Sequence, residues 1–452
     1  MSFWSALARK ITGSGYDAGK ARRRLAKWIT SGLGPKTEHL GAIRIRERAR
    51  DLDRNNETVR AAIDRLVSDV VGTGITPSPK NPEIRRLWDL WAADCDYDGL
   101  TDFYGIQSQA LMSMIVNGEV FIKVERDSKN VVRLQLLEPD HVPFKVNANS
   151  GKNRIIDGIE LDAHGRRVAY HILQNHPGDS SMHFGVNDTV RIPASEILHL
   201  FRPRRPGQLR GISWLAPAMV KLKNLADFDD AQLERQKLSN LYVGFITKAV
   251  EDPSVNVVDP TGAEVDQSDN NLALDLEPGI LQELLPGEGI EFTDPPGTTT
   301  GYLDFTRSQL RHIAASLGIP YALLTNDFAD VNDRVLRVAI NHYKRIVQQI
   351  VYQTMVPMLC KPALKAFIDS KVLSGELTWQ KDHLNCRWLP QPFDYIHPVQ
   401  DVASKVAQIN AGLSSRSDMI VEQGDDPESV DQMIAEDQSR AEKLGLTFKS
   451  LS

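Results

Sequence analysis

The feature that most constrains this chain is a long segment without positive charge. Between Ala249 and Thr306 the sequence contains no Lys, Arg or His but about thirteen Asp and Glu residues, so the segment carries a charge near −13. The whole chain has a net charge of −6, and the remainder therefore sums to about +7. Much of this excess lies in the first fifty residues, where twelve Lys or Arg residues stand against three acids.

Two interpretations of the acidic segment remain open. One is a solvated, partly disordered insertion, which is the common fate of such charge runs. The other is a small strand-rich module with an acidic surface, because short apolar runs at 255–258, 272–276 and 280–285 alternate with Pro-Gly turns.

The composition indicates a globular class. A chain of 452 residues with 41% hydrophobic side chains can form two to four packed modules. No apolar run is long enough to span a bilayer, and no signal-peptide core is present, so we expect assembly in the cytosol and no membrane partner. Cys95, Cys360 and Cys386 are far apart and odd in number, which predicts reduced, structural thiols.

The first half of the chain predicts an α+β domain that ends near Gly211. Apolar spacing indicates helices over 43–71, from Pro82 past Trp91, and over 103–116. Short β-branched or alternating runs then predict strands at 119–124, 131–137, 155–161, 168–173 and 197–201, with a hairpin turn at 162–165.

Two helices are expected to bracket the acidic segment. One is capped by Ser213 and continues toward Leu241 with a thin apolar stripe, and the other covers Tyr302 to Leu317. A short acidic loop from Thr325 to Asp333 follows, with Phe328 as an exposed aromatic candidate.

The longest predicted helix comes after this loop. About 22 residues precede Pro357, which corresponds to roughly 33 Å before the proline kinks the helix. A strand-like patch around 377–388 and amphipathic helices at 399–410, 416–422 and 427–444 complete the chain.

Catalytic and metal-binding motifs are weak. Asp94 to Gly99 matches the opening of a calcium loop, but the twelfth position, which should supply a bidentate Glu, is Gly105. Asp227, Asp229 and Asp230 could serve a metal-dependent nuclease, although positions 227 and 229 face different ways on a helix. No paired histidines, phosphate-binding loop or dinucleotide-binding fingerprint occurs, so we expect no metal and no cofactor.

Contact with nucleic acid would have to be of an unusual kind. A pI near 6 is atypical of a protein that grips a duplex through Lys and Arg. A conduit through which DNA slides needs the opposite, because an acidic lining repels phosphates. Four arginines within 201–211 could contact phosphates or form salt bridges between subunits: Arg202, Arg204, Arg205 and Arg210.

At this arginine segment the chain resembles the lambda-type family of tailed-bacteriophage portal proteins. The strings that carry the resemblance follow one another along nearly the whole chain: 15–18, 22–25, 48–52, 54–56, 71–75, 118–121, 136–140, 199–203, 210–217, 276–279, 318–321 and 330–332. One departure follows Asn332, where Asp333-Arg334-Val335-Leu336 stands in place of the Tyr-Ser-Ser-like run that is usual in the family.

The resemblance implies a non-enzymatic ring, usually of twelve subunits, at one capsid vertex of the virion, through which double-stranded DNA is packaged and ejected. Its subunits would assemble in the host cytoplasm with capsid and scaffolding proteins, and the ring would dock the terminase large subunit and then head-tail connector proteins. Twelve copies of the acidic segment would carry on the order of 150 negative charges.

The resemblance also implies a portal-type α+β fold with the following parts: a basic N-terminal arm (1–40), an α+β wing (41–212), a stem helix (213–248), an acidic clip (249–301), a second stem helix (302–324), a tunnel loop (325–334), a long spine helix (335–374), a wing return (375–398) and crown helices (399–452). The implied DNA-channel residues are Asn326, Asp327, Phe328, Asp330, Asn332 and Asp333. The implied docking residues of the clip are Asp259, Glu264, Asp266 and Asp269.

Two other classes of function remain as alternatives. One is a metal-dependent DNA-processing enzyme that uses the aspartates at 227–230 or the Asp94 loop. The other is a capsid or adaptor subunit without a channel.

Overall fold

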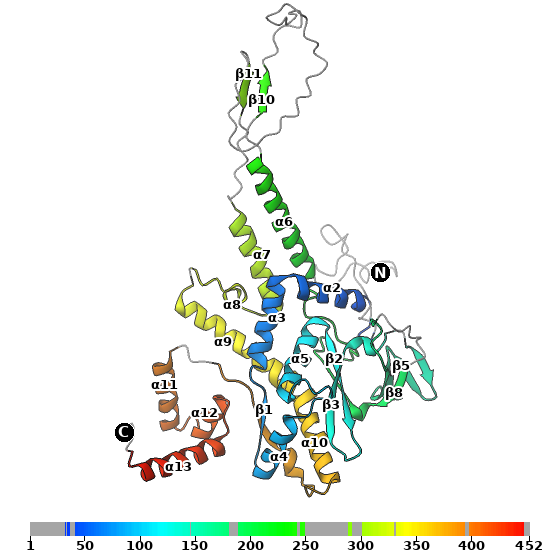
Figure 1. Cartoon of the computed structure of the whole chain (residues 1–452), viewed down its shortest axis with the longest axis vertical. Coiled ribbons are helices and arrows are strands. Elements are labelled where there is room, and N and C mark those ends of the chain that lie inside the picture. Colours follow the sequence, from blue (N-terminus) through cyan, green and yellow to red (C-terminus); the bar gives the residue numbers. More distant parts are fainter. Residues whose placement is uncertain are drawn as a thin grey trace, which may run out of the picture. The chain divides into compact units, whose positions relative to one another are not determined.

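The computed structural model of the chain describes residues 32, 34–36, 41–144, 146–179, 189–241, 245–248, 288–291, 301–329, 331–393 and 397–446. These residues form two compact units: one combines 1–216 with 329–452, and the other comprises 217–328. Both helices and sheets are present, so the predicted α+β class is confirmed (Figure 1). No helix in the described part of the chain combines the length and apolar composition needed to cross a lipid bilayer.

The first unit begins with a series of helices whose ends match the sequence signals. The helices are α2 (Ala42–Asn55), α3 (Glu57–Val70), α4 (Pro82–Ala92) and α5 (Phe103–Val116). Asn56 caps α3 by accepting a hydrogen bond from the Val59 backbone N–H, and Asp102 caps α5 in the same way. The helical pattern expected over 43–71 is confirmed and consists of two helices, which Asn56 separates in an extended conformation.

Two antiparallel sheets follow. The first has the order β3-β2-β9, from β2 (Glu119–Arg126), β3 (Val132–Leu137) and β9 (Ile197–Phe201). The second runs in sequence order through β4 (Ala148–Ser150), β5 (Asn153–Ile156), β6 (Ile159–Leu161), β7 (Arg167–Leu173) and β8 (Thr189–Pro193). The predicted hairpin at 162–165 is confirmed, because Gly165 N–H donates to the Asp162 carbonyl and Gly165 has φ 80°.

A continuous helix returns through this unit. It consists of α9 (Asp333–Ile350), a π-helical segment (Val351–Cys360) and α10 (Lys361–Leu373). Pro357 lies inside the π-helical segment, so the helix widens there instead of ending. This helix begins at Asp333, two residues earlier than the predicted start of the spine.

Aromatic packing joins these helices. Trp88 on α4 contacts the rings of Phe103 on α5 and Phe367 on α10 at centroid distances of 5.0 and 5.4 Å. Trp91 packs on the same two rings, and its indole N–H donates to the Val132 carbonyl of β3. The core of the first unit thus connects segments that lie more than 200 residues apart in the sequence.

The chain closes the first unit with a strand and three helices. Strand β12 (Cys386–Leu389) pairs antiparallel with β1 (Thr76–Pro79), a pairing that the sequence had not revealed. Then come α11 (Pro398–Asn410), α12 (Arg416–Glu422) and α13 (Pro427–Leu444), and all three predicted helices are confirmed. Asp426 connects this region to α4, because its carboxylate lies 3.0 Å from Arg85.

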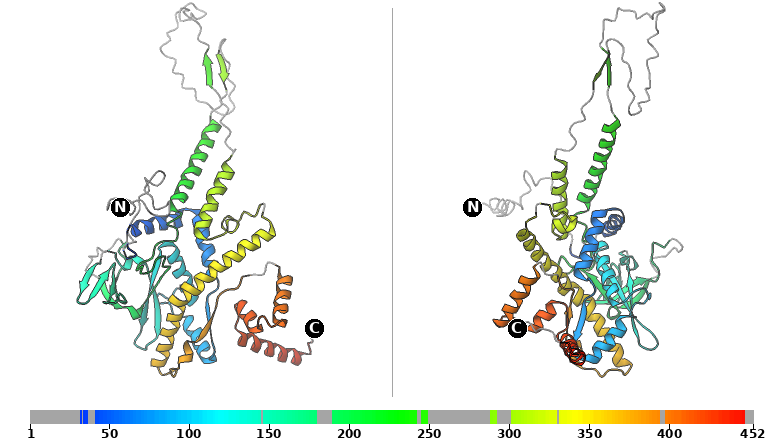
Figure 2. Two further views of the ribbon diagram at one scale, coloured as in Figure 1. Left: turned by 180° about the vertical axis from the view of Figure 1, so that it is seen from behind. Right: turned by 60° about the vertical axis from the view of Figure 1, so that its left-hand side comes forward.

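The second unit contains two long helices that lie side by side, α6 (Met219–Leu241) and α7 (Tyr302–Leu317), as both views in Figure 2 show. Short strands β10 (Phe245–Lys248) and β11 (Glu288–Glu291) pair antiparallel, and α8 (Tyr321–Thr325) follows α7. The predicted start of the first helix was wrong. Ser213 is buried, its hydroxyl donates to the Ile115 carbonyl, and the helix begins six residues later at Met219.

All three cysteines are free thiols, as predicted. Cys95 and Cys360 are buried, and burial raises the pKa of Cys95 to about 12. These thiols therefore stay protonated and serve packing.

Candidate functional site

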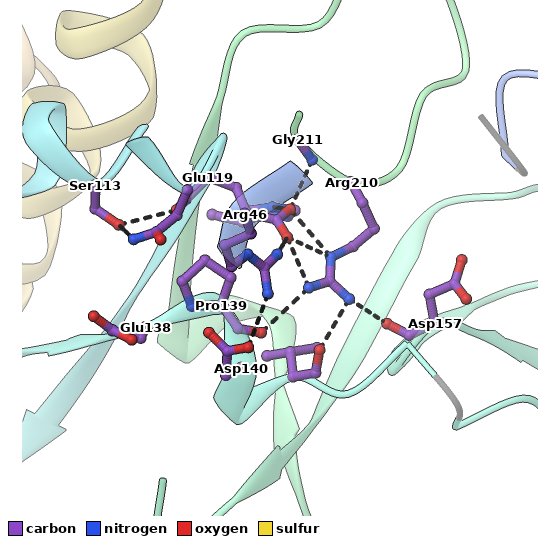
Figure 3. A network of polar contacts seen from close by, with 12 residues as sticks. Arg46, Ser113, Glu119, Glu138, Pro139, Asp140, Asp157, Arg210 and Gly211 are labelled. Atoms are coloured by element: carbon purple, nitrogen blue, oxygen red, sulfur yellow. Dashed lines mark hydrogen bonds and ion pairs between the residues drawn. The ribbon is translucent and has the colours of Figure 1, made fainter. Parts of the chain in front are cut away.

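The strongest electrostatic feature of the described chain is a buried carboxylate at the start of β2. Glu119 is fully buried and is contacted by donor groups of four residues, and Figure 3 shows three of them, Arg46, Arg210 and Gly211. Arg210 approaches it with Nη2 at 2.7 Å and Nε at 2.9 Å, and Arg46 Nη2 lies 3.1 Å away. The Gly211 backbone N–H at 2.7 Å and His199 Nε2 at 3.1 Å complete the set.

Two glycines make this geometry possible. Gly118 has φ 94°, a conformation that favours glycine. A Cβ atom on Gly211 would lie 2.1 Å from the Gly118 carbonyl oxygen, so the two backbones approach too closely for any side chain. The close approach brings the Gly211 N–H and the Arg210 side chain onto Glu119.

The Arg210 side chain is enclosed by groups of its own chain. Its Nη1 donates to the carbonyl oxygens of Val142 at 3.0 Å and Asp157 at 2.8 Å, and its guanidinium stacks 4.1 Å from the centre of the Phe144 ring. The side chain is almost completely buried. The prediction that Arg210 contacts a phosphate or a neighbouring subunit is therefore wrong, because the guanidinium neutralises Glu119 inside the fold.

The other three arginines of this segment lie closer to the surface. Arg202 is half-buried and lies 5.4 Å over the ring of Trp214. Arg204 and Arg205 are exposed, and their backbone N–H groups donate to the Gln208 side chain. A role in external contacts stays a prediction for these three.

The pKa values of Glu119 and His199 are both lowered, for different reasons. Burial alone would raise the pKa of Glu119, but Arg210 and the hydrogen bond from His199 hold that pKa well below its usual range. Burial lowers the pKa of His199 to about 4. His199 is therefore neutral at physiological pH, with Nε2–H donating to Glu119 and Nδ1 facing the Tyr170 hydroxyl.

A second group of charges connects α2 to the segment after β3. Arg50 Nη2 lies 2.7 Å from Glu138 and 2.5 Å from Asp140, while Arg46 Nη1 reaches Asp140 at 3.2 Å. Burial would raise the pKa of Asp140, but the two arginines lower it. Helix α2 is thus held to the sheet region by two arginines that lie one turn apart.

Within the described residues, Glu138, Asp140 and His176 form the one group with the spacing of a metal site. Arg50 already occupies both carboxylates. The Gly178 N–H donates to His176 Nδ1, which places the ring proton on Nε2, facing Glu138. A metal ligand would need Nε2 unprotonated, so the chemistry of this donor set fits an ion-pair network.

The aspartates of the nuclease alternative do not converge. Asp227 pairs with Lys223 at 2.5 Å on the same helix, and Asp229 accepts a hydrogen bond from the Tyr302 hydroxyl at 2.9 Å. Together with Asp230 they belong to no metal-type cluster among the described residues. The two-metal arrangement required for the nuclease alternative is therefore not formed by these side chains.

The Asp94 loop is a structural turn. Asp96 is buried and accepts hydrogen bonds from the backbone N–H groups of Asp98, Leu100 and Thr101. Asp94 points elsewhere and pairs with Arg133 at 2.7 Å. The carboxylates do not gather around a common centre, which agrees with the missing twelfth ligand.

The part of the predicted tunnel loop next to α8 is held by contacts within the second unit. Asn326 ends α8 in a left-handed conformation with φ 54°. Asp327 accepts a hydrogen bond from the Tyr321 hydroxyl at 3.0 Å and lies 3.4 Å from Arg307. Phe328, in contrast, is exposed as predicted.

On the α9 side, the loop residues belong to the helix start. Asn332 caps α9 by accepting from the Arg334 N–H, and Asp333 is in its first turn, 3.3 Å from His397 Nε2. Asp330 lies outside the described residues, as do Asp259, Glu264, Asp266 and Asp269 of the predicted clip and nearly all of the basic arm.

The comparison with known families decides the identity. A family model described as "Phage portal protein, lambda family" matches residues 21–350. The chain belongs to the lambda family of phage portal proteins. It is the portal protein of a tailed phage, and the resemblance drawn from the sequence strings is confirmed.

Relatives of this portal protein align along most of its length. A probable portal protein of Halomonas phage phiHAP-1 is 27% identical over 428 residues, which cover 89% of this chain and 81% of the relative. Portal protein B of Escherichia phage lambda is 22% identical over 434 residues, which cover 85% and 81%.

Solved structures also match, at lower similarity. A chain in the neck of an empty GTA particle has a TM-score of 0.49 and 15% identity, covering 85% of this chain and 93% of that one. An HK97 family phage portal protein from Corynebacterium diphtheriae has a TM-score of 0.33 and 10% identity, covering 79% and 96%.

Sequence reasoning named Arg210 but missed its partners. Glu119 and two of its partners, His199 and Arg210, come from three of the strings that carry the family resemblance. A fourth string, 136–140, is linked to them through Arg210, which donates to the Pro139 carbonyl. A signal was present for Glu119 and His199, because each stands within an apolar strand, β2 and β9 respectively. Which of these groups pair depends on the sheet order β3-β2-β9, which the strings do not encode.

Proposed function

We propose that this portal protein assembles into a ring of twelve subunits that encloses a channel for double-stranded DNA. The observation that carries the proposal is the apolar surface of the paired helices α6 and α7. Val220 is 71% exposed and Leu303 is 70% exposed, with Leu233 and Phe305 also at the surface. Exposed apolar side chains along a two-helix stem favour contact with another protein surface. In a ring of identical subunits the stem of the adjacent subunit provides that surface.

The stem pair is itself well defined. Phe228 of α6 contacts the rings of Tyr302 and Phe305 of α7 at 5.9 and 4.8 Å, and the Tyr302 hydroxyl donates to Asp229. Such a pair can act as one rigid piece in the ring. We assign 213–248 and 302–324 to the stem, 41–212 and 375–398 to the wing, 335–374 to the spine and 399–452 to the crown.

The acidic segment between the stem helices forms the clip in this proposal. Its charge near −13 in each copy would repel phosphates at the channel entrance and keep the duplex free to slide. The same surface would dock the terminase large subunit during packaging and the head-tail connector proteins afterwards. Capsid and scaffolding proteins would contact the outer face of the ring at one vertex of the virion, after assembly in the host cytoplasm.

The tunnel loop would contact the DNA through its exposed residues. Phe328 is the strongest candidate, because Asp327 and Asn332 are engaged in bonds that hold the loop ends. Asn326, Asp330 and Asp333 remain assigned to the same loop. The protein would act without enzymatic activity, as a conduit and an assembly platform, and without a cofactor.

Mass photometry of the purified chain tests this proposal. We expect a dominant species of about twelve times the 50.5 kDa protomer mass. Protein that stays monomeric or dimeric at every salt and protein concentration would refute the ring and with it the channel.

A further inference from the structure

The segment that contains the long helix α9 carries positive charge only. Between Asp333 and Asp369 the sequence has no Asp or Glu but six Lys or Arg residues, in a chain whose net charge is −6. Four of the six stand in α9: Arg334, Arg337, Lys344 and Arg345. The carboxylate of Asp333, at the start of the helix, lies 3.3 Å from His397 Nε2. Helix α9 is therefore a basic element of an acidic protein.

One face of α9 packs on its own unit. Tyr343, Val347 and Ile350 are buried, and the Tyr343 hydroxyl donates to Asp69 of α3 at 2.7 Å. Successive residues of a helix are turned by about 100°, so the side chains on the opposite face can be read from their spacing. This opposite face is a row of five exposed side chains, which we call the outer stripe: Arg334, Val338, His342, Arg345 and Gln349. The outer stripe is about 22 Å long.

A third face of α9 is turned toward the C-terminal helices. Arg337, Asn341 and Lys344 line a groove of about 450 Å³ together with residues of α11 and α12. The Lys344 ammonium lies 5.1 Å from the centre of the Phe393 ring. The residues that line the groove include no member of the outer stripe. The outer stripe is thus the face of α9 that neither the core nor this groove occupies.

The two arginines of the outer stripe differ from other arginines of the first unit. Arg60 and Arg133 pair with nearby carboxylates, for example. Within the residues that the structure describes, neither Arg334 nor Arg345 lies at ion-pair distance from a carboxylate. Arg334 also stands in the first turn of α9, where its charge adds to the positive end of the helix dipole. This arrangement is unfavourable in isolation and becomes favourable when an anion binds nearby.

The chemistry of the outer stripe specifies the kind of anion. Two guanidinium groups, an imidazole and an amide supply hydrogen-bond donors along the helix, and no acidic group interrupts them. The centre of a protein–protein interface is usually apolar, whereas Val338 is the one apolar member of this row. Arg and Gln side chains are, in contrast, common contacts of the phosphate oxygens of DNA.

We propose that the outer stripe of α9 contacts the phosphate backbone of double-stranded DNA in the portal channel. This inference rests on the proposed function and names the helix face that meets the DNA. The acidic segment between α6 and α7 would repel phosphates, and the outer stripe would attract them. Each copy offers only two guanidinium groups, so these contacts are few and the duplex can still slide.

Neutral substitutions of the two arginines test the contact. Binding of a short fluorescent DNA duplex to purified rings is followed by anisotropy over a series of NaCl concentrations. In the Arg334→Gln, Arg345→Gln variant the affinity at low salt should fall by at least about tenfold. The slope of log K against log[NaCl] should become less steep by about 0.9 for each phosphate contact that is lost.

Two further variants separate charge at this face from net charge. Arg334→Lys with Arg345→Lys keeps both positive charges and should keep the wild-type slope. The matched control is Arg44→Gln with Arg48→Gln, which removes two exposed arginines of α2 and changes the net charge of the chain equally. This control should bind the duplex with wild-type affinity.

Photo-cross-linking gives a direct second readout. Benzoylphenylalanine in place of Gln349, a member of the outer stripe, should cross-link to the duplex on irradiation. The same group in place of Gln432, an exposed residue of the acidic helix α13, should give no cross-link to DNA.

The outcomes separate this inference from the proposed function. Wild-type rings whose DNA affinity and salt slope are unchanged in the Arg334→Gln, Arg345→Gln variant would overturn the contact and leave the ring intact. A variant that no longer forms rings in mass photometry would also overturn it, because the outer stripe would then be a contact between subunits. A wild-type chain that never forms rings would overturn both the ring and the contact inside its channel.

Discussion

Replacing Glu119 with Gln tests the central electrostatic bond of the first unit. The substitution keeps the shape of the side chain but removes a charge that Arg210 and Arg46 approach at 2.7 and 3.1 Å in a fully buried position. Arg210 would then face a neutral amide and two backbone carbonyls in place of a carboxylate. Removing one partner of a buried ion pair costs about 3–5 kcal/mol, because the other charge stays desolvated.

The size of this loss can be read from a melting temperature. At about 2–4 °C for each kcal/mol, the Glu119→Gln variant should melt roughly 6–20 °C below wild type at pH 7.5 and equal protein concentration. The matched control is Arg204→Gln, an exposed arginine of the same segment, which should shift the melting temperature by less than about 2 °C. A Glu119→Gln variant that melts within about 2 °C of wild type would refute the reasoning.

Three further predictions address the pH response, the stem and the acidic segment. Burial lowers the pKa of His199 from 6.5 to about 4. Between these two pH values the unfolded chain binds a proton at His199 and the folded chain does not. The free energy of unfolding should therefore fall as the pH drops from about 6.5 to about 4. The depressed pKa of Glu119 adds a further loss below about 4.5. In urea unfolding followed from pH 7.5 to 4, His199→Gln should abolish the first slope, and curves that stay parallel to wild type would contradict this assignment. In the stem, Phe228→Ala should lower the stability of the second unit by about 1–2 kcal/mol, because it removes two ring contacts. Tyr302→Phe keeps the ring and removes one part-buried hydrogen bond to Asp229, so it should shift thermal unfolding less. Equal effects of the two substitutions would count against the aromatic contact as the main interaction of the stem. Changing Glu264, Asp266 and Asp269 to Lys should impair terminase binding or DNA packaging in vitro and leave ring formation intact, and an unchanged packaging yield would argue against the clip assignment.

Much of the secondary structure followed from local signals in the sequence. The C-terminal helices were predicted with nearly correct ends, because Asp426 and Gly445 are clear start and stop signals around α13. The hairpin at Asp162 to Gly165 was equally local. In these elements the deciding interactions lie within four residues, so one stretch of sequence contains them.

The errors arose where distant contacts override a local signal. Ser213 is a good capping residue, yet its hydroxyl bonds to Ile115 about a hundred positions away, and the helix starts later. The spine helix, in contrast, continues past Pro357 as expected, and the proline lies within a π-helical segment. The pairing of β1 with β12 joins residues more than 300 positions apart, and neither segment alone signals it.

The candidate site also contains residues that local sequence predicted correctly and residues that it did not. Exposure of Phe328 followed from its position in a polar loop. Arg210, by contrast, belongs to a segment of arginines, prolines and glycines that is typical of an exposed loop. Only the close approach of Gly118 and Gly211 brings it onto Glu119, and such an approach is a property of the folded sheet.

Three-dimensional reconstruction of the purified protein by electron microscopy tests the central claim most directly. Closed rings with an open central hole, and with the segment 249–301 at one end of that hole, are the predicted result. Particles without a pore, or protomers that keep their acidic segment buried within a single subunit, would contradict the account.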